Sequence, residues 1–169
     1  KMSFQLAVKW YDNGDYFKAC DLFQTIPAFA FFPVEGILKM LWCYYAAGRY
    51  SQLEECLSRS DIANFQSCMP YEYHYLNAIA LNLQMNKKAA LVEVQQARQY
   101  CGGQKIREFQ IDDLEQQLLV NLSERQKAKA IYDRRAKEVP DLAARTADKK
   151  LYGKMLRSTL EFYRGRRAQ

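Results

Sequence analysis

The chain has little histidine and no closely spaced cysteine pair. His74 is the only histidine among 169 residues, and the five cysteines are scattered without a CxxC pattern. Structural zinc sites and small disulfide frameworks both depend on close or regular ligand spacing. We therefore expect no metal, no cofactor and reduced thiols, and these thiols suit the cytoplasm or another reducing compartment.

Long hydrophobic runs are also missing. The densest apolar stretch, residues 37–47, is interrupted by Lys39 and is shorter than the run of about 18 residues that a membrane-spanning helix needs. The first residues do not have the basic and then apolar pattern of a signal peptide. We expect no transmembrane segment, while a 49% hydrophobic and 14% aromatic composition is sufficient for a folded core.

Glycine and proline are sparse, and two of the seven glycines mark a repeat. Gly14 and Gly48 lie 34 residues apart, and each is followed two positions later by a tyrosine, Tyr16 or Tyr50. Each glycine ends one apolar helical pattern and precedes a second. This period is typical of helix-turn-helix repeats, and no segment alternates with period two. The sequence therefore predicts an all-α fold.

The first two units resemble tetratricopeptide repeats. That family has a large and then a small residue, an aromatic residue three positions later, Gly-x-Tyr in the turn, and then Ala-x3-Phe. The first unit supplies Leu6, Ala7, Trp10, Gly14, Tyr16, Ala19 and Phe23, and we expect Trp10 and Phe23 to be buried. The second unit supplies Ile37, Met40, Leu41, Tyr44, Gly48, Tyr50, Leu53 and Leu57. Leu41 and Leu53 are larger than the family prefers.

Two further units follow with weaker patterns. The third has a turn at 85–87 and is displaced by three extra residues in a linker at 64–70, and the fourth has a turn at Ser123 and ends at Pro140. The Gly102-Gly103 pair reads as a loop within one array. The resemblance implies a right-handed α-solenoid of hairpins near 2–33, 35–68, 71–102 and 109–140, closed by a basic C-terminal capping helix and tail at 141–169.

No arrangement of residues suggests catalysis. His74 lacks a neighbouring pattern of metal ligands or triad partners, so we expect a packing or surface role. The carboxylate pairs Glu54-Glu55 and Asp112-Asp113 are sequence neighbours, so on a helix their side chains point about 100° apart and do not converge on one substrate atom. We expect these pairs to lie on solvated helix faces. Cysteines on the apolar stripes are expected to be inert. The sequence therefore predicts that the protein is not an enzyme.

The resemblance also implies that the first helix of each hairpin lines a concave groove. The residues placed there are mostly large and apolar: Phe4, Val8, Tyr11, Leu38, Trp42, Tyr45, Tyr75 and Ile79. Because the segment 37–47 is apolar almost all round, something should cover its second face. An amphipathic helix or extended apolar segment of a partner would do so. The alternative is that the chain's own C-terminal helix, or another domain, fills the groove.

One familiar role of the family does not fit this chain. Tetratricopeptide domains that dock Hsp70 or Hsp90 clamp a C-terminal carboxylate with lysine, arginine and asparagine. Phe4, Val8, Lys39, Glu72 and Leu76 occupy the corresponding places here, so the charge-assisted hydrogen bonds are missing. The sequence favours an interaction scaffold or chaperone-like adaptor for another protein partner.

Positive charge is concentrated at the C-terminal end. Residues 125–169 hold 14 basic and 5 acidic residues, a net charge of +9, whereas the remainder is −3. Several basic residues could share one side of the final helix: Lys149, Lys150, Lys154, Arg157, Arg164, Arg166 and Arg167. This predicts, as an alternative function, a nucleic-acid-associated or anionic-surface-binding subunit of a larger complex. An acidic protein would satisfy the same charges.

Overall fold

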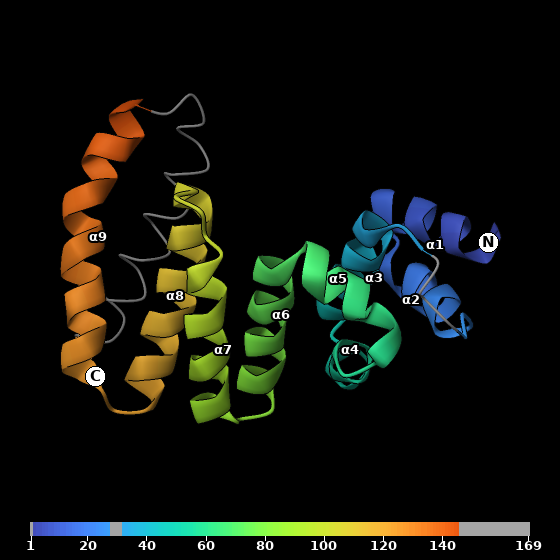
Figure 1. The fold of residues 1–169 in the computed structure, drawn as a ribbon, viewed down its shortest axis with the longest axis horizontal. Helices are drawn as coiled ribbons and strands as arrows, with labels where there is room; N and C mark the ends of the chain where they lie inside the picture. Colours follow the sequence, from blue (N-terminus) through green and yellow to red (C-terminus); the bar gives the residue numbers. More distant parts are fainter. Residues whose placement is uncertain (1, 28–31, 146–169) are drawn as a thin grey trace. The chain divides into compact units, whose positions relative to one another are not determined.

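The computed structural model describes residues 2–27 and 32–145, and these residues form helices without any strand (Figure 1). The all-α prediction is confirmed. The helices are α1 (Met2–Asp12), α2 (Tyr16–Gln24), α3 (Val34–Ala46), α4 (Tyr50–Leu57), the 3-10 helix η1 (Ser60–Ile62), α5 (Ala63–Cys68), α6 (Pro70–Leu83), α7 (Lys87–Gln99), α8 (Lys105–Asn121) and α9 (Arg125–Arg145). None of them is long and apolar enough to cross a bilayer.

The chain divides into two compact units at the Gly102-Gly103 pair. Unit 1, Lys1–Gly102, contains α1 to α7, and unit 2, Gly103–Gln169, contains α8 and α9. Both glycines have positive φ, at 58° and 73°, a backbone region that side chains with a Cβ rarely adopt. The glycine pair therefore lies at the boundary between the units, in the place where the sequence predicted a loop.

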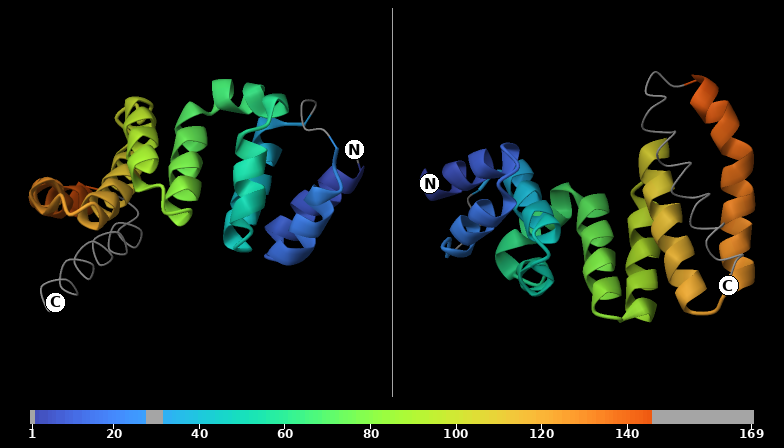
Figure 2. Two further views of the ribbon diagram at one scale, coloured as in Figure 1. Left: turned by 90° about the horizontal axis from the view of Figure 1, so that it is seen from below. Right: turned by 180° about the vertical axis from the view of Figure 1, so that it is seen from behind.

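Four antiparallel hairpins share one type of turn: α1/α2, α3/α4, α6/α7 and α8/α9 (Figures 1 and 2). The turn residues Gly14, Gly48, Met85 and Ser123 have φ between 64° and 83°. In each turn, the N–H of this residue donates to the carbonyl oxygen three residues earlier, and the next N–H donates to the oxygen five residues earlier. This is the Schellman pattern of a helix C-terminus. All four expected turns are confirmed.

The connection between the second and third hairpins is helical. The linker expected at 64–70 is largely occupied by α5, which follows directly on η1, and these two helices bury Phe65 and Ile62. Because α5 packs against both α3 and α6, the additional residues of this segment contribute to the core of unit 1. This short helical segment was not predicted, because its nine residues are too few to show a clear 3.6-residue pattern.

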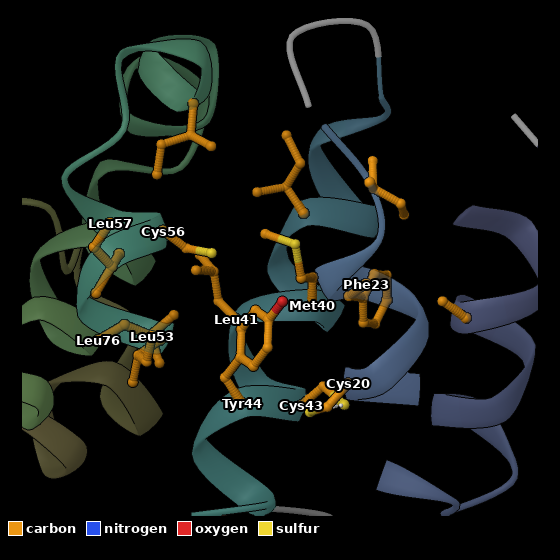
Figure 3. Packing of buried hydrophobic residues seen from close by; sticks show 14 of the residues in the cluster. Cys20, Phe23, Met40, Leu41, Cys43, Tyr44, Leu53, Cys56, Leu57 and Leu76 are labelled. Carbon is orange, nitrogen blue, oxygen red and sulfur yellow. Dashed lines mark hydrogen bonds between the residues drawn. The ribbon is translucent and has the colours of Figure 1, made fainter. Parts of the chain in front are cut away.

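The core of unit 1 runs continuously from α1 to α6, and Figure 3 shows part of it. Figure 3 shows Phe23 and Met40 where α2 meets α3, and Leu53, Leu57 and Leu76 where α4 meets α6. Phe23 is fully buried as predicted. These side chains explain why successive hairpins in unit 1 pack on one another.

The expected core face of α1 is only partly correct. Trp10 is half-buried, with Lys18 Nζ 4.6 Å from its ring centroid, and Leu6 is 47% exposed. One repeat later the equivalent residue Met40 is fully buried, because α1 and α2 both pack on α3.

In unit 2, α9 does not end where the sequence predicted. The helix continues through Pro140 to Arg145, so the expected boundary between a fourth hairpin at 109–140 and a separate helix from residue 141 is wrong. An internal proline removes one backbone hydrogen bond and favours a kink, but it need not end a helix. The helix-forming alanine, leucine and arginine residues on both sides favour continuation. The remainder of the predicted cap, residues 146–169, lies outside the described residues.

The contact between α8 and α9 is partly ionic. Asp112 is buried and accepts a 2.7 Å hydrogen bond from Arg134, while Asp113 lies 3.5 Å from Nη1 of the buried Arg135. The expectation that Asp112-Asp113 forms a solvated face is therefore wrong. Both carboxylates face α9, because successive helix residues at this position straddle the interface between the two helices.

Candidate functional site

Five aromatic rings of unit 1 form a continuous chain of contacts, which we call the aromatic row: Tyr50, Tyr45, Trp42, Tyr75 and Tyr71. The Tyr50 and Tyr45 centroids are 6.2 Å apart, and Tyr45 meets Trp42 at 5.7 Å in an edge-to-face arrangement. Trp42 and Tyr75 are 6.4 Å apart, and Tyr75 stacks on Tyr71 at 5.7 Å. The row therefore connects α4 and α3 of the second hairpin with α6 of the third.

The helical register places these rings together. Trp42 and Tyr45 are three residues apart on α3, and Tyr71 and Tyr75 are four apart on α6, so each pair shares a helix face. The turn at Gly48 brings Tyr50 back toward Tyr45. The packing of α5 against both α3 and α6 joins the two helices at the Trp42–Tyr75 contact.

The row is graded from a buried end to an exposed end. Tyr71 is buried, Trp42 and Tyr75 are half-buried, and Tyr45 and Tyr50 are each 37% exposed. Each ring has an aromatic neighbour, and such pairs are worth about 0.5–1.5 kcal/mol beyond their buried area. The exposed rings are thus held in place before any ligand arrives. Large rigid rings lose little side-chain entropy when a partner covers them.

Among the groove residues predicted from the sequence, the structure brings Trp42, Tyr45 and Tyr75 into one contact network. Val8, Tyr11 and Leu38 are half-buried and pack against the core of unit 1. Ile79 is half-buried on α6. The sequence argument missed Tyr50 and Tyr71. The aromatic residue two positions after the turn glycine was a signal for Tyr50, and the i, i+4 spacing to Tyr75 was a signal for Tyr71.

Phe4 is the member of the predicted groove that the structure places elsewhere. Its ring is 4% exposed, stacks on Phe32 at a centroid distance of 4.0 Å, and meets Phe23 edge-on at 5.7 Å. It also lies directly against Gly36, where a Cβ would come within 2.5 Å of the ring. Because glycine lets α3 approach α1 so closely, Phe4 belongs to the core and not to a binding surface.

Two ion pairs connect the first and second hairpins at the surface. Lys39 Nζ lies 2.7 Å from Asp12 Oδ1, and Arg49 Nη2 lies 2.5 Å from Asp21 Oδ1. Exposed pairs of this kind are worth about 0–1 kcal/mol. Lys39 is therefore engaged with α1.

Comparison with known proteins gives no identification. No protein-family model matches this chain, and no curated protein or solved structure does so either.

His74 has a polar and an aromatic partner. Its Nδ1 lies 2.7 Å from Glu93 Oε2, and its ring stacks on Tyr100 at a centroid distance of 5.8 Å. These contacts join α6 to α7, which is consistent with the expected packing role. Within 2–27 and 32–145, no group of three or more histidine, cysteine or acidic side chains is arranged to hold a metal ion.

Two of the cysteines meet inside unit 1. Cys20 Sγ on α2 and Cys43 Sγ on α3 lie 3.0 Å apart, and both residues are fully buried (Figure 3). The hydrogen bond between the two thiols lowers the pKa of Cys20, against the effect of burial. The same hydrogen bond, together with burial, raises the pKa of Cys43. All five cysteines are free thiols.

The predicted basic surface cannot be placed. Lys149, Lys150, Lys154, Arg157, Arg164, Arg166 and Arg167 all lie outside the described residues. Within the described part of α9, Lys127 pairs with Glu124, Lys129 with Asp133, and Arg134 with Asp112. These three cations of α9 are therefore balanced locally by carboxylates.

Proposed function

We propose that the chain is a non-enzymatic protein-interaction module, a scaffold or chaperone-like adaptor. Its aromatic row binds an apolar helix or an extended apolar segment of a protein partner. The hairpins stack as in a tetratricopeptide array, a right-handed α-solenoid. The observation that carries the proposal is the continuous ring chain from Tyr71 to Tyr50, with its outer two rings exposed.

The energetics of the row support binding. Interfaces are enriched in tyrosine and tryptophan, and a few such residues supply most of the binding free energy. Tyr45 and Tyr50 still expose over a third of their surface, and the half-buried Trp42 contacts Tyr45 on its other side in the row. A partner that covers the outer rings would therefore extend an already packed aromatic cluster.

The recurring turn supports the stacked-hairpin architecture. The fifth residue after each turn residue is Ala19, Leu53, Ala90 or Ala128, and all four are buried. Each donates its backbone N–H to the carbonyl oxygen of the residue directly after the turn residue. The same local geometry thus recurs at intervals of 34, 37 and 38 residues, as expected of a repeat array whose linkers vary in length.

The proposal can be tested by photo-crosslinking the full chain. A benzophenone amino acid replaces Tyr45 in one variant and Phe17 in a second. Phe17 is a matched control because it is an aromatic residue on α2, in the same unit, and is 66% exposed. Each variant is mixed with a displayed library of amphipathic-helical and extended apolar peptides. We expect selected peptides to crosslink at position 45 and not at position 17.

Binding constants of a selected peptide complete the test. Tyr45→Ala and Trp42→Ala should each weaken binding by more than about 1 kcal/mol, as anchor residues do, while Phe17→Ala should leave it unchanged. Equal effects at positions 17 and 45 would refute a specific aromatic site. Tyr45 already contacts Trp42 and Tyr50, so crosslinks within α3 and α4 are expected in the free chain. Crosslinks from position 45 to residues of the same chain outside these two helices would instead identify an internal segment as the occupant. In that case the row serves the protein's own folding.

A further inference from the structure

The Cys20–Cys43 contact has chemistry that the proposed function does not use. The two thiols are 23 residues apart in sequence and come from different hairpins, yet their sulfur atoms are 3.0 Å apart. A disulfide bond is about 2.05 Å long, so the sulfur atoms need to approach by about 1 Å to bond. We propose that Cys20 and Cys43 form a redox-sensitive dithiol site, which a small peroxide converts into a disulfide that links α2 to α3.

The surroundings distinguish Cys20 from an ordinary buried thiol. Cys43 Sγ lies 3.0 Å from Cys20 Sγ and can also donate to the Tyr16 carbonyl oxygen at 3.1 Å. The hydrogen bond between the two thiols, and to a lesser degree the nearby Arg49 guanidinium, lower the pKa of Cys20. Cys56 is also buried but has the Tyr44 hydroxyl as its neighbour, and burial raises its pKa to about 11. Among the buried thiols Cys20, Cys43 and Cys56, Cys20 is therefore the one whose surroundings favour the thiolate.

The reaction balances with hydrogen peroxide as the oxidant. The Cys20 thiolate attacks one peroxide oxygen, the O–O bond breaks, and hydroxide leaves, so that Cys20 becomes a sulfenic acid. The hydroxide released in this step removes the Cys43 proton and becomes water, and the Cys43 thiolate attacks Cys20 Sγ while the S–O bond breaks and a second hydroxide leaves. The second hydroxide takes up the proton that Cys20 released when it ionised. The two sulfur atoms lose two electrons, and two thiols plus one peroxide yield one disulfide and two water molecules.

Burial selects the oxidant. Both residues are fully buried, so a reagent must be small or must enter during a local opening between α2 and α3. Peroxide adds only one oxygen atom to Cys20, whereas a low-molecular-weight disulfide would attach a bulky group to it. Once formed, the new bond would fix the first hairpin to the second beside the Arg49–Asp21 ion pair. This link between the two hairpins would form whether or not a partner is bound.

The test uses the reduced full chain and mass spectrometry. The protein is treated with hydrogen peroxide, its remaining thiols are alkylated in denaturant, and the digest is searched for linked peptides. We expect a Cys20–Cys43 disulfide that dithiothreitol reverses, and loss of these two thiols at least about tenfold faster than loss of Cys56. Alkylation of both cysteines after the exposed Cys68 has been fully oxidised would overturn the proposal.

Variants and melting curves separate the dithiol from general oxidation. Cys56→Ser should form the same disulfide, whereas Cys20→Ala should slow the oxidation of Cys43 to the rate of Cys56. The oxidised wild-type chain should melt at a higher temperature than the reduced chain, because the crosslink restricts the unfolded state. A lower melting temperature after oxidation would mean that the native packing does not accept the bond, and would also overturn the proposal.

Discussion

The contact between Phe4 and Gly36 yields a quantitative prediction about packing. A Cβ on Gly36 would lie 2.5 Å from two ring atoms of Phe4, and this ring is confined by Phe32 and Phe23. Overpacking a core lowers the free energy of unfolding by about 1–3 kcal/mol, while replacing a helical glycine with alanine raises it by about 0.5–1 kcal/mol. We therefore expect Gly36→Ala to lower the free energy of unfolding by about 1–2 kcal/mol.

A double-mutant cycle isolates this steric cause. Phe4→Ala alone should cost about 3–5 kcal/mol, because it leaves a cavity in the core. With the ring removed, Gly36→Ala should become neutral or slightly stabilising, which gives a coupling energy of about 2 kcal/mol. Urea unfolding followed by tryptophan fluorescence is a suitable assay, because both tryptophans of the chain, Trp10 and Trp42, lie in unit 1.

Gly48→Ala provides the matched control. This glycine has a φ of 70°, and no atom lies within 4 Å of the position that an alanine Cβ would occupy. Alanine there should therefore cost about 1–2 kcal/mol through backbone strain alone. That cost should be the same with and without Phe4. If Gly36→Ala is equally destabilising in the presence and absence of Phe4, the close approach of α1 to α3 is refuted. Phe4 could then belong to the binding surface, as the sequence predicted.

Three further outcomes follow from local structure. Met85 has a φ of 65° and is 71% exposed, so Met85→Gly should stabilise unit 1 by about 1 kcal/mol in urea unfolding, and a loss of stability would contradict the turn geometry. Arg135 is buried beside Asp113, so Arg135→Ala should destabilise unit 2 by about 2–4 kcal/mol. Circular dichroism is the suitable assay, because both tryptophans lie in unit 1. No change in stability would contradict the burial of Arg135. Burial raises the pKa of Cys56 from 9.0 to about 11, so the folded state retains this proton more tightly and stability should fall by about 2 kcal/mol as pH rises from 9 to 11. Cys56→Ala should flatten that part of the pH profile.

The sequence was informative about the turns because turn geometry is local. A helix that ends in a Schellman motif needs one residue with positive φ, and glycine is the cheapest choice. Gly14 and Gly48 therefore marked their turns directly. Met85 and Ser123 adopt the same conformation without glycine and were found only from the helical pattern on both sides.

The contacts between helices were less predictable, because they depend on how closely two helices approach. Phe4 had the correct helical register for the groove, but Gly36 lets α3 approach α1 and encloses the ring. Leu6 had the register of a core residue, yet it is 47% exposed, whereas the equivalent residue Met40 is buried where α1 and α2 pack on α3. Register determines the side of a helix on which a residue lies, whereas burial depends on what packs against that side.

The same distinction explains why the aromatic row was only partly foreseen and the dithiol was not. Trp42, Tyr45 and Tyr75 could be grouped because each lies on the first helix of its hairpin, the helices that a tetratricopeptide resemblance assigns to one surface. Cys20 lies on a second helix and Cys43 on a first helix, so no repeat rule compares them. Their contact arises where α2 packs against α3 of the next hairpin. The Cys20–Cys43 contact therefore depends on how the second helix of one hairpin packs on the first helix of the next, which motifs within one hairpin do not reveal.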